Sequence, residues 1–101
     1  MTSEEYEAYV ALRCKPYTDV NYCVIALNGE AGEVAEWYKK FILRGNTVGN
    51  LSVEDLKGEL GDVLFYLTRL ASLHGWSLND VMEAKRAKLD QRVKEGMKQI
   101  A

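Results

Sequence analysis

Residues 29–34 read GEAGEV, and residues 58–63 read GELGDV. Each segment places two carboxylates three residues apart, so both lie on one face of a helix with about 5–6 Å between their Cβ atoms. The acids are Glu30, Glu33, Glu59 and Asp62. We predict that this internal repeat brings two helices together around one shared group of carboxylates.

The two segments lie within the longest helical patterns of the chain. Apolar residues recur every three or four positions over residues 19–43 and again over residues 52–74, with a turn-rich stretch at residues 44–50. Shorter helical patterns cover residues 3–13 and 77–96. Because no stretch alternates with a period of two, the sequence predicts an all-α fold, an antiparallel four-helix-bundle-like domain over residues 1–101.

A hairpin of the two long helices would bring the acids together. A hairpin centred on residue 46 pairs the first acid of each segment with the second acid of the other. If Ala31 and Leu60 are core positions, all four acids flank the same seam. Packed helix axes lie about 8–10 Å apart, so inward-reaching carboxylates can meet across the gap.

The ordinary alternative for acids on helices is a solvated surface. Stabilising acids usually have a basic residue four positions on, as Glu36 has in Lys40. The four acids of the internal repeat instead have Val34, Trp37, Val63 and Tyr66 at that position. Each acid also follows a glycine, and four glycines inside helices cost about 4 kcal/mol relative to alanine. This cost favours a function, and convergent carboxylates need a cation.

The ligand chemistry indicates which cation. All-oxygen ligands favour Mg²⁺, Mn²⁺ or Ca²⁺ over zinc or copper. A di-iron bundle would need Glu-x-x-His pairs, but the single histidine, His74, has Ala71 three residues before it. Mg²⁺ held by a few carboxylates keeps positions for water and substrate phosphates. We therefore predict a Mg²⁺ centre, with Mn²⁺ as a substitute, and hydrolysis of a phosphoanhydride.

Composition excludes several other classes. A chain of 101 residues with 28% charged side chains fits one globular domain, and a net charge of -2 gives no basic field to attract nucleic acid. No segment approaches the roughly 20 apolar residues of a membrane span, and the first residues lack a signal peptide pattern. Cys14 and Cys23 have no metal-ligand spacing, so we expect reduced thiols and a cytoplasmic protein.

At the paired acids, over residues 26–92, the chain resembles the MazG-like, all-α nucleoside triphosphate pyrophosphohydrolases. The resemblance implies cleavage of a nucleoside triphosphate to the monophosphate and pyrophosphate, which fits housekeeping of nucleotide pools. It also implies a homodimer or homotetramer and Mg²⁺ bound by Glu30, Glu33, Glu59 and Asp62, with Glu33 our choice of catalytic base. Two alternatives stay open: a phosphoribosyl-ATP pyrophosphatase-like enzyme, and a non-catalytic helical module that binds nucleotide or a partner.

Two positions depart from the family pattern. Many relatives have two consecutive acids where this chain has Gly29 followed by one acid, and small relatives often have asparagine in place of Lys85. The side chains of Lys85, Lys88 and Arg92 share one helix face and lack an acid four residues before them. Two interpretations of this basic face are equally open: it binds phosphate oxygens of the substrate, or it is simply exposed to solvent.

Two aromatic residues follow the acids by one helical turn. Trp37 lies four residues after Glu33, and Tyr66 lies four residues after Asp62. Because the helices run in opposite directions, the two rings should border opposite ends of the acidic cluster. Each ring is a candidate for stacking on a nucleobase, although aromatic residues at helical spacing more often belong to the core.

Overall fold

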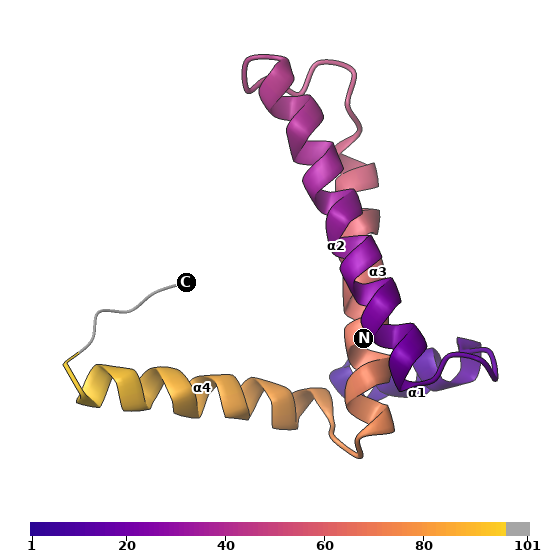
Figure 1. Cartoon of the computed structure of the whole chain (residues 1–101), viewed down its shortest axis with the longest axis vertical. Coiled ribbons are helices and arrows are strands. Elements are labelled where there is room, and N and C mark those ends of the chain that lie inside the picture. Colours follow the sequence, from indigo (N-terminus) through magenta and orange to yellow (C-terminus); the bar gives the residue numbers. More distant parts are fainter. Residues whose placement is uncertain (97–101) are drawn as a thin grey trace.

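Four α-helices and no strand make up residues 1–96, the part of the chain that the computed structural model describes. The helices are α1 (Ser3–Arg13), α2 (Val20–Leu43), α3 (Val53–Leu73) and α4 (Leu78–Lys94) (Figure 1). The predicted all-α class is confirmed, and the helix bounds follow the predicted ranges closely. Residues 97–101 of the predicted single domain lie outside the described part.

Each helix begins at a polar residue that caps its free backbone amides. The side chains of Thr2, Asp19, Ser52 and Ser77 accept hydrogen bonds from amides of the first turn. Helix α4 opens with a full capping box, in which the Ser77 and Asp80 side chains each accept a hydrogen bond from the other residue's backbone amide. After α3, Gly75 has a φ of 80°, a left-handed conformation that glycine adopts without strain. These caps explain why the sequence marks the helix bounds so well.

Helices α2 and α3 form an antiparallel hairpin that is the main packed unit of the chain (Figure 1). Buried or half-buried side chains recur on α2 every three or four residues, at Cys23, Leu27, Glu30, Val34, Trp37 and Phe41. The same holds on α3 at Leu56, Glu59, Val63, Tyr66 and Leu70. These two stripes form the seam, and one glutamate of each helix occupies a seam position.

The register of the hairpin differs from the predicted one by about one turn. The Trp37 indole N–H donates to the Ser52 carbonyl at 2.9 Å, and further along, the rings of Tyr22 and Tyr66 lie 6.2 Å apart. These contacts place the first acids of the two segments opposite each other. The assumption that Ala31 and Leu60 are core positions is wrong, because both are exposed in the chain.

Helices α1 and α4 lie at the C-terminal end of α3 (Figure 1). The Glu7 carboxylate on α1 accepts a hydrogen bond from the Leu78 amide at the start of α4, at 3.4 Å. From there α4 projects away from the hairpin and, within residues 1–96, contacts α1 and α3 but not α2. The predicted antiparallel bundle is therefore present as the hairpin with α1 against it, while α4 diverges.

The buried core of one chain is small. Among residues 1–96, the buried residues are Val10, Thr18, Cys23, Thr68 and Ala71. Many large apolar side chains are exposed instead, including Ile25, Tyr38, Ile42, Leu60, Leu64, Trp76 and Met82. None of the four helices combines the length and the hydropathy that crossing a bilayer requires. So many exposed large apolar side chains on such a short chain indicate a protein contact.

We therefore expect a homodimer or larger homo-oligomer. Sedimentation velocity at micromolar concentration should give at least twice the chain mass of 11.4 kDa. Leu64→Glu, on an α3 side chain that is 41% exposed, should shift the protein toward monomer, because a charge would be buried in the contact. A monomeric wild-type protein at that concentration would refute the expectation.

Candidate metal centre

Three carboxylates converge in the middle of the hairpin. Glu30 of α2 and Glu59 and Asp62 of α3 each place one oxygen within 4.8 Å of the others. The two glutamates reach this point because they occupy seam positions, and Asp62 lies one turn after Glu59 on the same face. Both glutamates are half-buried and Asp62 is exposed, so the group opens to solvent on one side.

The charges of this group repel one another. Burial raises the pKa of Glu30, and the neighbouring carboxylates of Asp62, Glu59 and Glu33 raise it further, in that order. The ion pairs found in residues 1–96 all join residues within one helix turn elsewhere, so none of them neutralises these acids. A bound cation would remove the repulsion.

Glu33, the fourth predicted ligand, lies beside the group rather than in it. Its side chain is exposed, and its charge reaches Glu30 closely enough to raise that pKa. Together with Glu59 it lines a polar cleft of about 240 Å³ that leads toward the turn and also includes Glu36, Trp37, Lys40, Ser52 and Asp55. Glu33 therefore stays a predicted ligand and base, now placed at the edge of the centre.

The donor set and the space around it fit a hard divalent cation. All three converging ligands are carboxylate oxygens, the donors that Mg²⁺ and Mn²⁺ accept readily. The glycines before the acids, Gly29, Gly32, Gly58 and Gly61, have nothing within 4 Å of the position of an added Cβ. These glycines do not serve close packing of α2 on α3. They leave open space beside the acids, where water or substrate phosphates can approach the cation.

The two predicted stacking residues have different surroundings. Trp37 is half-buried, its N–H is used by Ser52, and its ring stacks on Phe41 with 5.7 Å between centroids. This residue holds the hairpin together, which is the core role that aromatic spacing usually indicates. Tyr66 is also half-buried: burial raises its pKa, and the charges of Tyr22 and Glu30 raise it further.

The sequence analysis did not single out two tyrosines that pack around the hairpin. Tyr22 packs against Tyr66. On α1, burial raises the pKa of Tyr6, and the charges of Tyr9 and then Asp62 raise it further. Tyr22 lies two turns before Glu30 on the same helix, a spacing that could have pointed to it. Nothing in the sequence marks Tyr6, because it comes to the acids through the packing of α1 on α3.

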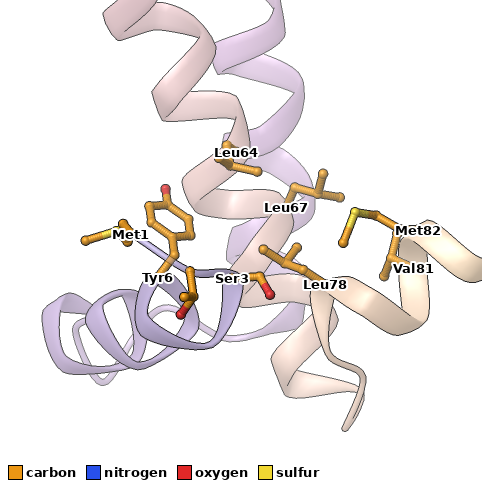
Figure 2. A pocket seen from close by; sticks show the side chains of 9 residues that line it. Met1, Ser3, Tyr6, Leu64, Leu67, Leu78, Val81 and Met82 are labelled. Carbon is orange, nitrogen blue, oxygen red and sulfur yellow. The ribbon is translucent and has the colours of Figure 1, made fainter.

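An apolar cavity of about 410 Å³ opens where α1, α3 and α4 meet. Figure 2 shows its walls: Met1, Ser3 and Tyr6 from the α1 end, Leu64 and Leu67 from α3, and Leu78, Val81 and Met82 from α4. The sequence analysis did not find this cavity. It depends on the direction in which α4 leaves α3.

The three predicted phosphate-binding residues, Lys85, Lys88 and Arg92, are not brought to the acids within one chain. All three lie on α4 beyond the cavity, on the part of the helix that projects away from the hairpin (Figure 1). Lys85 and Lys88 are exposed and Arg92 is half-buried.

Comparisons with known proteins agree on the region that carries the acids. Residues 21–97 match the family model described as the MazG nucleotide pyrophosphohydrolase domain. The chain is also similar to the Gene 37 protein of Mycobacterium phage L5, with 32% identity over 85 residues that cover 83% of this chain and 75% of that protein. No solved structure matches the chain significantly.

The raised pKa of Glu30 predicts how pH affects the metal-free protein. Ionising Glu30 costs more in the folded than in the unfolded chain, so the free energy of unfolding should fall as pH rises through the raised pKa. Glu30→Gln should remove this slope and stabilise the metal-free protein at neutral pH by a few tenths of a kcal/mol for each relieved pair. Thermal unfolding in chelator at several pH values measures the effect.

Glu36→Gln is the matched control, because Glu36 is exposed and pairs with Lys39 at 3.9 Å. It should give no gain in stability. Added Mg²⁺ should raise the melting temperature of the wild type and of this control much more than that of Glu30→Gln. Equal responses of all three proteins to Mg²⁺ would contradict a metal centre at Glu30.

Proposed function

Since the chain belongs to the MazG nucleotide pyrophosphohydrolase family, we propose that it converts nucleoside or deoxynucleoside triphosphates to monophosphates and pyrophosphate with Mg²⁺. One observation carries the proposal: Glu30, Glu59 and Asp62 converge with their oxygens within 4.8 Å of one another, without a basic partner from their own chain among the described ion pairs. Housekeeping of nucleotide pools in the cytoplasm is the role we propose for this activity.

We propose different roles for the residues of the centre. Glu30, Glu59 and Asp62 would hold the cation, with Glu33 as a further ligand at its edge, and bound Mg²⁺ would neutralise the triphosphate and lower the pKa of a water. Glu33 lies outside the converging group and is exposed, so its carboxylate is available to accept the proton of the attacking water. Tyr66, a seam residue that the charge of Glu30 reaches, and Trp37, which lines the cleft beside Glu33 and Glu59, are the aromatic residues that we propose as nucleobase contacts.

The reaction we propose is attack on the α-phosphorus. The oxygen of water forms a bond to that phosphorus, the bond to the bridging oxygen of the β-phosphate breaks, and Glu33 takes the proton. Pyrophosphate leaves with its charge spread over two phosphates. The phosphoribosyl-ATP pyrophosphatase-like alternative uses the same chemistry on another substrate, whereas the non-catalytic module would bind nucleotide and release no pyrophosphate.

Substitutions of the acids test the centre. Glu30→Gln, Glu59→Gln and Asp62→Asn should each lower turnover by about two orders of magnitude or more while the helix content by circular dichroism stays unchanged, because each removes a ligand charge. Glu33→Gln should lose turnover but keep much of the stabilisation by Mg²⁺, since it acts as a base at the edge. Glu36→Gln should remain active, and near-normal turnover in two of the three ligand variants would exclude this centre.

The position of bond cleavage has its own test. Hydrolysis in ¹⁸O-labelled water should put the label into the nucleoside monophosphate, as mass spectrometry of the products would show. Label in pyrophosphate would place the attack on the β-phosphorus, and free orthophosphate would mean another kind of hydrolase. A panel of canonical and modified triphosphates together with phosphoribosyl-ATP would identify the substrate, and binding without pyrophosphate release would favour the non-catalytic module.

A further inference from the structure

We propose that the polar cleft beside the metal centre receives the two terminal phosphates of the substrate, where Lys40 and Arg44 bind them. The nucleoside then lies at the other end of the acids, toward Tyr66. The inference rests on the proposed function, since it gives the substrate of that same centre a direction along the hairpin. Of the two proposed nucleobase contacts, this direction uses Tyr66.

The polar cleft runs from the acids toward the turn of the hairpin. Glu33 and Glu59 line its inner end, and Asn50, Leu51 and Ser52 line its outer end. Among residues 1–96, Lys40 is the basic residue that lines this cleft. It lies seven residues after Glu33, which is about 10 Å along the axis of α2. A chain of phosphates that begins at the acids can therefore extend to the Lys40 ammonium group.

Arg44 adds a second cation at the outer end of the cleft. It is the C-cap of α2 and lies four residues after Lys40, on the same helix face. A Cβ added to Gly49 would lie 3.1 Å from Nη1 of Arg44, so the guanidinium packs against the backbone of the turn there. Gly49 has a φ of 54°, which glycine adopts without strain. The next residue, Asn50, lines the cleft, so the guanidinium lies beside the cleft wall.

The charges of Lys40 and Arg44 are not used by the acids around them. The sequence places Lys40 four residues after Glu36, but the Glu36 carboxylate pairs with Lys39 instead, at 3.9 Å. None of the ion pairs found in residues 1–96 includes Lys40 or Arg44. Both cations are therefore available to an anion that enters the cleft.

The carboxylates that line the cleft each have another source of positive charge. Glu36 has Lys39, and Asp55 lies in the first turn of α3, where the helix N-terminus is partly positive. Glu33 and Glu59 belong to the metal centre, where Mg²⁺ would compensate their charge. The charge that remains at the outer end is that of the two cations. This end therefore suits the terminal phosphates, where most of the negative charge of a triphosphate lies.

The opposite end of the acids is aromatic. The rings of Tyr66 and Tyr22 lie there with 6.2 Å between their centroids, and Tyr17 packs on Tyr22 at 5.3 Å. The guanidinium of Arg69 on this side donates to the Thr18 carbonyl at 3.4 Å, so it is engaged by the chain. Aromatic side chains stack on nucleobases with little regard to sequence, which suits this end to the nucleoside.

Binding of pyrophosphate in the presence of Mg²⁺, measured by isothermal titration calorimetry, tests the phosphate end without turnover. Lys40→Ala and Arg44→Ala should each weaken this binding about tenfold, because each removes a charged hydrogen-bond donor. Lys40→Arg should keep most of the wild-type affinity, since the charge remains. The matched control is Lys57→Ala, because Lys57 is exposed, pairs with Glu54 at 3.1 Å and does not line the cleft. Equal affinities of the wild type and Lys40→Ala would overturn the proposal.

Binding of a nucleoside monophosphate, the other product, tests the nucleoside end. Lys40→Ala should leave this affinity unchanged, whereas Tyr66→Leu should lower it about tenfold and leave pyrophosphate binding unchanged. Weaker pyrophosphate binding by Arg69→Gln, together with unchanged binding by Lys40→Ala, would reverse the direction in favour of Trp37 and overturn the proposal. If the wild type binds both products but releases no pyrophosphate from any triphosphate, the proposed function fails, while these affinities still decide the direction.

Discussion

Two glutamates occupy seam positions of a helix pair, where apolar side chains would ordinarily pack, and the rest of the structure accommodates this constraint. Glu30 and Glu59 are half-buried and face each other, with Asp62 one turn away. Carboxylates in such a place repel one another and lose hydration. The hairpin therefore has to be held together on both sides of them, and this is where its aromatic side chains lie.

Toward the turn, Trp37 stacks on Phe41 and anchors Ser52 through a hydrogen bond of 2.9 Å. Toward the other end, Tyr66 packs against Tyr22, whose ring also meets Tyr17 at 5.3 Å. These two aromatic groups bracket the acids and fix their register. Trp37 is thus part of the scaffold of the hairpin, and it also lines the polar cleft beside Glu33 and Glu59, so it stays a predicted nucleobase contact.

The sequence predicted the local features and missed the long-range ones, for a physical reason. Caps, turns and apolar period depend on neighbouring residues, so the helix bounds and the residue types of the centre could be read from the chain. The register could not, because Ala31 and Val34 lie on adjacent stripes of α2 and only contacts such as Trp37 with Ser52 choose between them. The direction of α4 after Gly75 is likewise set by packing on α1, through Glu7 and Leu78, and not by the turn alone.

The same constraint links stability to binding. Half-buried acids lower the stability of the metal-free hairpin, while the exposed apolar surface lowers the gain that a single chain obtains from folding. A cation at the acids and a partner on the exposed apolar surface would each remove one of these deficits. Because both would favour the folded chain over the unfolded one, each would also favour the binding of the other wherever folding is incomplete. A small chain with this arrangement would be most stable in the metal-bound, assembled state.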